Sequence, residues 1–200
     1  MPQAGEQPGQ DTVHIQCLVV EPLFLALLLI VLGSTLPAAP RVLARIRSHW
    51  QLVSLYPLWR TLTDAVPETR LDTPPSRAAD ATNPLRTHDR LYRRTIEIRD
   101  SILTLADYAP AELRGRSYDH ATSLGFIGAH ADITAEACWL AVAREERLRG
   151  TTTGSGEPMP PASGGRDLAT EIRALTTLST AYRSRATQDF LRAHLEETPA

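Results

Sequence analysis

The hydrophobic and polar positions divide the chain into one continuous apolar run and several segments with helical periodicity. The apolar run, residues 22–40, carries no charged residue. Behind it, apolar side chains recur every three or four positions, which is typical of amphipathic helices, and no useful stretch alternates as a strand does. The pattern therefore predicts an all-α chain, with a single N-terminal transmembrane helix followed by a small cytosolic helical bundle.

The predicted transmembrane helix covers residues 13–40. Residues 23–36 alone would span about 21 Å, less than the roughly 30 Å of a hydrocarbon core, so the helix must begin near residue 13. Glu21 and Pro22 would then lie inside it, where a carboxylate is costly and a proline bends the helix. A buried core helix and a surface helix are the alternatives. A cleaved signal peptide is disfavoured, because residues 1–40 contain no Arg or Lys.

The charges beside the run predict its orientation. Arg41, Arg45 and Arg47 follow it, whereas the charged residues that precede it are all acidic. The positive-inside rule then places the C-terminal side in the cytoplasm. We expect a single-pass protein of the cell membrane, with residues 1–12 as a disordered tail on the outer side.

Residues 41–66 are predicted to form a juxtamembrane helix. Pro57 lacks an amide hydrogen, so we expect a break near Leu55 and Tyr56. Trp50 and Trp59 allow two interpretations. They lie at headgroup depth on anionic lipid, or they belong to the core of the following domain.

Residues 67–195 are predicted to form the cytosolic helical domain, with a flexible linker at 150–165. Its first part, 67–87, is rich in proline and reads as a loop with one short turn at 76–81, and Thr87 is the expected N-cap of the next helix. The expected helices are residues 87–109, 117–129, 134–148 and 167–195. On the third of these helices, Ala137, Leu140, Ala141 and Leu148 are expected to be buried.

The helix at 87–109 has the clearest pattern. Five positions form one apolar stripe: Leu91, Thr95, Ile98, Ile102 and Leu105. Its charged residues, Arg90, Arg93, Arg94, Glu97, Arg99 and Asp100, are most simply an ion-paired, solvated face, with Arg93 and Glu97 as an i, i+4 pair. The alternative is that the arginines hold an acidic partner or a phosphate.

The composition argues against two kinds of protein, one that binds nucleic acid and one held together by disulfides. All 21 basic residues are Arg, and the net charge is −2, so no overall charge favours nucleic acid. The absence of Lys is most simply a codon bias. Cys17 precedes the apolar run at 22–40 and Cys138 follows it, which argues against a disulfide, and Cys138 is expected to be a packing residue.

Candidate chemistry is sparse. Asp119, His120, His130 and Asp132 hold the only cluster of His and carboxylate side chains. The ten-residue separation of the two histidines is not the i, i+4 spacing of a helical zinc pair. Nucleophile-elbow and phosphate-loop motifs are also missing. We therefore expect no enzyme activity, no catalytic or metal site and no cofactor. A hydrolase that uses His120, His130 and Asp132 remains a lesser alternative.

Two motifs carry a family resemblance: YPLWRTLTDAVPETRLD at residues 56–72 and HDRLYRRTIEIRDSILTL at residues 88–105. They resemble the C-terminal domain of an uncharacterised actinobacterial group of membrane proteins described as transporters. The resemblance covers residues 23–195 and carries no established activity. The family usually has several spans where this chain has one predicted span, and a lone helix cannot line a substrate pathway by itself.

The positions that match these motifs form the candidate interaction or structural network. They are Trp59, Arg60, Glu68, Arg90, Tyr92, Arg93, Arg94, Glu97, Arg99 and Asp100, with Pro67 beside them. The favoured hypothesis is a membrane-anchored module for protein interaction or regulation. Membrane lipid and a protein partner or a second copy are the expected partners, with no nucleic acid and no identified small molecule. The alternative is a subunit or truncated relative of a multi-span transporter.

Overall fold

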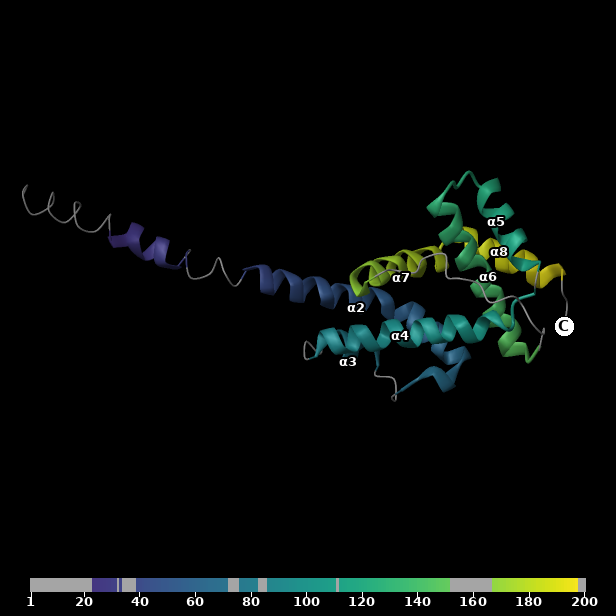
Figure 1. Ribbon diagram of the computed structural model, residues 1–200, viewed down its shortest axis with the longest axis horizontal. Helices are drawn as coiled ribbons and strands as arrows, with labels where there is room; N and C mark the ends of the chain where they lie inside the picture. Colours follow the sequence, from purple (N-terminus) through teal and green to yellow (C-terminus); the bar gives the residue numbers. More distant parts are fainter. Residues whose placement is uncertain are drawn as a thin grey trace, which may run out of the picture. The chain divides into compact units, whose positions relative to one another are not determined.

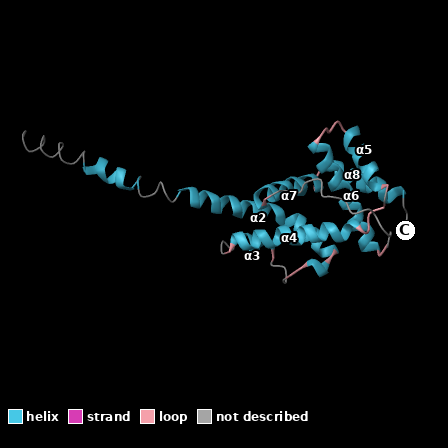
Figure 2. Ribbon diagram, viewed as in Figure 1, coloured by secondary structure: helices cyan, strands magenta, loops and turns pink. Residues whose placement is uncertain are grey.

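The computed structural model describes residues 23–31, 33, 39–71, 76–82, 86–110, 112–151 and 167–197. All regular secondary structure in these ranges is helical, so the chain is all-α there (Figures 1 and 2). The labelled elements are α2 (Ala39–Ala65), η1 (Pro67–Thr69), α3 (Arg77–Thr82), α4 (Thr87–Ala106), α5 (Leu113–Ser123), α6 (Ala129–Arg149), α7 (Leu168–Tyr182) and α8 (Arg185–Glu197).

The chain divides into two units, residues 1–46 and residues 47–200. In the first unit, residues 23–31 are helical, and all their side chains are exposed. The predicted tail at 1–12 and much of the predicted span, residues 13–22, 32 and 34–38, lie outside the described residues. In the described part of the chain, no helix combines the length and apolar character that crossing a bilayer requires.

In the second unit, α6 is the central helix. It contacts α4, α5, α7 and α8. Three consecutive residues, Cys138, Trp139 and Leu140, are all buried. Successive helical positions point about 100° apart, so α6 must be covered on several sides. Alanines at 137, 141 and 143 are buried as well, and their small side chains let neighbouring helices approach closely. Leu148 is exposed, contrary to prediction, because it lies near the end of α6.

The main core is built by α2, α4, α6 and α7, with Phe190 from α8. The predicted stripe on α4 is confirmed, since Leu91, Thr95, Ile98, Ile102 and Leu105 are all buried. On α7, Ile172, Leu175 and Leu178 are buried, and their spacing of three residues places them on one side of the helix. The two tryptophans of α2 differ: Trp59 is 4 % exposed and belongs to the core, whereas Trp50 is 69 % exposed.

The predicted break in α2 near Pro57 is wrong, because the helix continues through the proline. A proline inside a helix removes only one backbone hydrogen bond, and its neighbours can compensate. Here two carbonyls just before Pro57 accept side-chain hydrogen bonds. Arg94 Nη1 donates to the Leu52 oxygen at 2.7 Å, and Ser179 Oγ donates to the Ser54 oxygen at 3.2 Å. Contacts from α4 and α7 therefore support α2 at this point.

Several helix boundaries also differ from the prediction. The predicted loop at 67–87 contains both η1 and α3, where Asp80 and its arginine partners hold the short helix. Arg86, in a left-handed conformation, precedes α4, and Thr87 is its first helical residue rather than its N-cap. The α5 helix starts four residues early, at Leu113. The α6 helix starts at Ala129, directly after Gly128, whose φ of 54° suits a glycine.

The predicted helix at 167–195 is two helices. The first, α7, ends at Tyr182, and the backbone amide of Arg183 caps it. Ser184 then starts α8, because its Oγ accepts the Thr187 amide at 3.4 Å, as an N-cap serine does. The apolar pattern continues without interruption across residues 183 and 184, so it does not predict this turn. The linker predicted at 150–165 lies outside the described residues except at 150 and 151.

Candidate functional site

The residues of the predicted network gather around α4. The inner side of α4 faces α6, α7 and η1, and its outer side is exposed. The structure therefore separates the ten candidates into three groups. Some form a buried polar network with α2 and α3, some make ion pairs with other elements, and some lie on the outer face.

Arg94 is the centre of the buried network. It is 5 % exposed, and its guanidinium makes two hydrogen bonds to the carboxylate of Asp80, at 2.9 and 3.1 Å. The guanidinium also lies over the rings of Trp59 and Tyr56, 4.7 and 5.3 Å from their centroids. Arg90 pairs with the same carboxylate. A buried arginine needs such partners, because leaving it unpaired costs several kcal/mol, on the order of 3–5.

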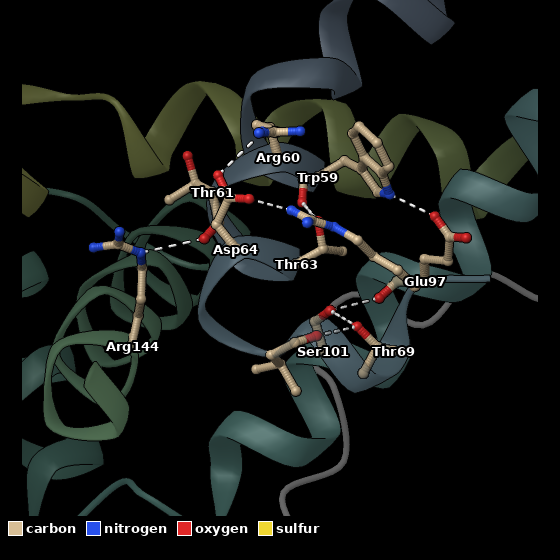
Figure 3. A network of polar contacts seen from close by, with 11 residues as sticks. Trp59, Arg60, Thr61, Thr63, Asp64, Thr69, Glu97, Ser101 and Arg144 are labelled. Atoms are coloured by element: carbon tan, nitrogen blue, oxygen red, sulfur yellow. Dashed lines mark hydrogen bonds and ion pairs between the residues drawn. The ribbon is translucent and has the colours of Figure 1, made fainter. Parts of the chain in front are cut away.

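Trp59 and Glu97 join α2 to α4. The indole Nε1 donates to the Glu97 carboxylate at 2.5 Å, and the two side chains point toward one another in Figure 3. The other carboxylate oxygen accepts the backbone amide of Leu71 at 3.1 Å. Glu97 thus fixes both the core helix α2 and the segment after η1, and it is buried rather than solvated.

Hydroxyl groups and arginines extend this network along α2 and η1 (Figure 3). Ser101 and Thr69 share a hydrogen bond of 2.9 Å between α4 and η1. Arg70 donates to Thr63 Oγ1 at 3.0 Å and pairs with Asp64. Arg60 pairs with the same Asp64 at 3.1 Å, within α2. Each bond restrains the chain where α2 passes into η1.

Two further candidates make ion pairs with α6 and α7. Arg99 pairs with Glu171 of α7 and lies 3.7 Å from Glu136 of α6. Glu68 of η1 pairs with Arg147 of α6 at 3.1 Å. The predicted solvated face is therefore wrong for much of α4. Because other elements pack on both of its sides, Arg94 and Glu97 are buried and Arg99 is half-buried.

Tyr92, Arg93 and Asp100 lie on the outer face, where they are exposed. Ile96 and Leu103 share this face, and they leave much of their apolar surface in contact with solvent. A hollow of about 510 Å³ lies at the N-terminal half of the face. It is lined by Leu71, His88, Asp89, Tyr92, Arg93 and Ile96. This outer face can receive an apolar side chain between charged neighbours.

A second hollow, of about 270 Å³, lies between α2, α6, α7 and α8. Pro57 and Leu58 supply apolar lining, and Tyr182 supplies a phenol. Burial raises the pKa of Tyr182 to about 12, against a lowering by Arg144. The phenol therefore remains a neutral donor. Arg144 is already engaged, because its Nε donates to the Thr61 oxygen at 3.2 Å.

The two histidines of the His and Asp cluster pack against different aromatic side chains. His120 lies against the Phe190 ring and contacts the Ala186 oxygen at 3.1 Å, so its contacts join α5 to α8. His130 packs against Phe126. The described ranges hold no group of three or more His, Cys, Asp or Glu residues arranged to bind a metal. Cys138 is buried, and burial raises its pKa to about 11, against a lowering by Thr187.

Sequence reasoning missed the acidic partners of the arginines. Asp80 lies in a segment read as a loop, and Glu136 and Glu171 lie on helices remote in sequence. One signal could have indicated Asp80. Arg90 and Arg94 are an i, i+4 pair of like charge, and such a pair needs an acid from another element.

The comparisons with curated proteins and with solved structures each gave no match. The comparison with protein families gave one match, to a family of unknown function (DUF6545), over residues 43–184. The matched range includes α4, the hollow beside it, part of the second hollow and nearly all of the core. Because the match covers more than half of the chain, the protein belongs to this family of unknown function.

Proposed function

We propose that the protein is a membrane-anchored helical module that binds a protein partner through the outer face of α4. The observation that carries the proposal is the exposure of three apolar side chains on one face of a helix whose opposite face is already in the core. Tyr92 is 53 % exposed and Leu103 is 58 % exposed, and Ile96 lies between them.

The position of these side chains favours docking over scattered exposure. At 100° per residue, positions 92, 96 and 103 fall within a narrow arc. Single exposed apolar residues are ordinary on a protein surface, whereas an aligned set beside a hollow is typical of an interaction site. The hollow bounded by Leu71 and Tyr92 provides the concave element that an anchoring side chain needs.

The apolar residues before α2 support the membrane part of the proposal. Residues 23–31 are uncharged and exposed along a helical segment. Such a surface is costly in water and favourable in hydrocarbon, at roughly 25 cal/mol per Å². Arg45 and Arg47 on the C-terminal side favour an orientation with the helical bundle in the cytoplasm.

A photocrosslinker at position 92 tests the proposal. Tyr92 is replaced by p-benzoylphenylalanine in the full-length chain, and native membranes are irradiated. Tyr118 of α5 is the matched control, because it is also an exposed tyrosine on a helix of the same bundle. We expect a discrete crosslinked product from position 92 and none from position 118.

The proposal fails if position 92 gives no product, or if both positions give the same products. Mutating Arg93 and Arg94 together would be a poor test, because Arg94 is buried and its loss would destabilise the bundle as well as change the surface. Arg93 alone is exposed and suits a surface test.

The uncharged residues 23–31 also favour a second candidate, a subunit or truncated relative of a multi-span transporter. Such a subunit would contact other membrane helices through this segment. Purification of the tagged chain from native membranes in mild detergent, with mass spectrometry, separates the two functions. A multi-span protein in stoichiometric amount would favour the subunit, and its absence would favour the docking module.

A further inference from the structure

We infer that the hollow between α2, α6, α7 and α8 binds a small carboxylate that carries a short apolar body. The described lining of this hollow includes no residue of α4, so the inference is separate from the docking function proposed above. It depends on three features of the lining: its charge, its apolar surface and a buried phenol.

The charged part of the lining is entirely positive. Arg144 of α6 and Arg183, the residue that follows α7, both line the hollow. None of the described residues that line it is acidic. In the part of the chain that the structure describes, Arg183 forms no ion pair. Two guanidinium groups without a lining carboxylate favour an anionic ligand.

Backbone contacts hold both guanidinium groups and leave donors for a ligand. Arg144 Nε donates to the Thr61 oxygen at 3.2 Å (Figure 3), and Arg183 Nε donates to the Ser179 oxygen at 3.1 Å. Each bond uses one of the five N–H groups of a guanidinium. Arg144 also lies 3.6 Å from Glu145, but both side chains are partly exposed, and such ion pairs are weak. The remaining donors suit a carboxylate, which accepts two parallel hydrogen bonds from one guanidinium.

Tyr182 adds a neutral donor to the same hollow. Burial raises the pKa of its phenol to about 12, so the hydroxyl keeps its proton at neutral pH. Among the described residues, none forms a hydrogen bond with this hydroxyl. A buried tyrosine hydroxyl usually has a partner. An oxygen atom of a ligand in the hollow would be that partner.

The apolar part of the lining and the volume define the rest of the ligand. Pro57 and Leu58 of α2, Ala141 of α6 and Leu191 of α8 supply apolar surface. The volume of about 270 Å³ lies just below the roughly 300–1,000 Å³ of pockets for drug-sized molecules, so the ligand is small. An inorganic anion would leave the apolar surface in contact with water, and a neutral hydrocarbon would leave the arginines without an anion. A short-chain carboxylate satisfies both parts of the lining.

Hexanoate tests this class of ligand. The full-length chain in mild detergent is titrated with hexanoate that carries ¹³C at its carboxyl carbon, and NMR follows the carboxyl resonance. Hexanol has the same chain without the charge, acetate has the charge without the chain, and inorganic phosphate is a different anion. We expect saturable binding of hexanoate, with each of the three other compounds competing at least tenfold more weakly. No saturable shift, or hexanol or phosphate competing as well as unlabelled hexanoate, overturns the inference.

Three variants test whether the hollow is the place of binding. Arg183→Gln removes a charge and Tyr182→Phe removes only a hydroxyl, so each should weaken hexanoate binding about tenfold. Arg185→Gln is the matched control, because Arg185 is an exposed arginine two residues further on that does not line the hollow. Its affinity should stay within about twofold of the original chain. If all three variants fold by circular dichroism and bind hexanoate equally, the ligand lies elsewhere and the inference is wrong.

Thermal unfolding provides a second measurement. The lining comes from four helices, so the unfolded chain has no such site, and a ligand that binds only the folded state raises its stability. Hexanoate should therefore raise the melting temperature of the original chain and of Arg185→Gln, and raise that of Arg183→Gln by much less. An equal rise in all three chains would contradict binding at Arg183.

Discussion

At the residue scale, Arg93 and Arg94 show how far neighbouring side chains of one type can differ. Arg94 is enclosed by Asp80, two aromatic rings and a backbone carbonyl, whereas Arg93 is exposed. The two side chains are chemically identical, so their different burial follows only from their positions on the helix. The adjacent pair therefore provides its own control for mutation.

Arg94→Met should lower the free energy of unfolding by about 3 kcal/mol, because it leaves the buried Asp80 carboxylate with Arg90 as its remaining cation. Arg93→Met should change it by less than about 0.5 kcal/mol, as exposed substitutions do. Urea unfolding of the full-length chain in mild detergent, followed by circular dichroism, measures both. Equal effects of the two substitutions would contradict the buried network.

Trp59→Phe removes the indole donor to Glu97 and keeps most of the apolar ring. The buried carboxylate then retains only the Leu71 amide, so the expected loss of stability is about 1–3 kcal/mol. Trp50→Phe, at the exposed tryptophan, should cost less than about 0.5 kcal/mol. The same urea experiment compares them. A Trp59→Phe chain as stable as the original would show that Glu97 does not depend on the indole.

Cys138 should resist thiol reagents in the native protein. With its pKa raised by burial to about 11, only about one thiol in three thousand is ionised at pH 7.5. A native Cys17→Ser chain should react far more slowly with a disulfide reagent than the same chain in urea. Fast labelling of the native chain would contradict the buried position.

Burial of Cys138 also has a consequence for stability at alkaline pH. The pKa is raised above its ordinary value of 9.0, so the folded state holds its proton more tightly than the unfolded state does. This contribution to stability is complete below pH 9 and is lost as the pH rises to about 11. A Cys138→Ala chain should lose less stability between these two pH values than the original chain.

At the scale of single elements, α7 is stabilised by its N-cap residue, Asp167. Asp167 accepts the Thr170 amide at 2.9 Å, and this bond, with a second from the Thr170 hydroxyl, lowers the pKa of the carboxyl group. Because the pKa is lowered on folding, the stabilising effect is present above the ordinary carboxyl range and is lost as the pH falls through the folded value.

Asp167→Ala should therefore lower the melting temperature at pH 7, and the difference from the original chain should shrink toward pH 3. Asp167→Asn keeps an N-cap acceptor without the charge, so its melting temperature should fall between the other two. Thermal unfolding by circular dichroism at both pH values measures this. A difference that does not change with pH would exclude the carboxylate as the stabilising group.

The elements also show what local sequence can predict. The stripe on α4 was predicted completely, because a helical period is encoded within the helix itself. The break predicted at Pro57 and the single helix predicted over residues 167–195 are wrong. Side chains from α4 and α7 support α2 near the proline, and the cap of Ser184 interrupts an otherwise continuous apolar pattern. Within the candidate site, the arginines of α4 were identified from local motifs, whereas Asp80 and Glu171 were not, because only the tertiary fold brings them near.

At the scale of the whole molecule, the polar contacts join segments that are far apart in sequence. Trp59 bonds to Glu97, Arg99 to Glu171, and Glu68 to Arg147. These contacts link α2, η1, α4, α6 and α7 around one core. All members of that core lie between Leu52 and Phe190, within residues 47–200, and the family match at 43–184 covers nearly the same range.

The position of the core predicts where the chain can be cut. A chain that begins at Arg47 keeps every buried core residue, so it should unfold cooperatively at nearly the same urea concentration as the full-length chain. A chain that begins at Pro67 loses the part of α2 that buries Leu52, Trp59 and Leu62, and it exposes the apolar sides of α4 and α6 that α2 covers. This shorter chain should show no cooperative transition by circular dichroism. If it unfolds like the longer one, α2 is not part of the folding unit, and the role assigned to the bond between Trp59 and Glu97 is wrong.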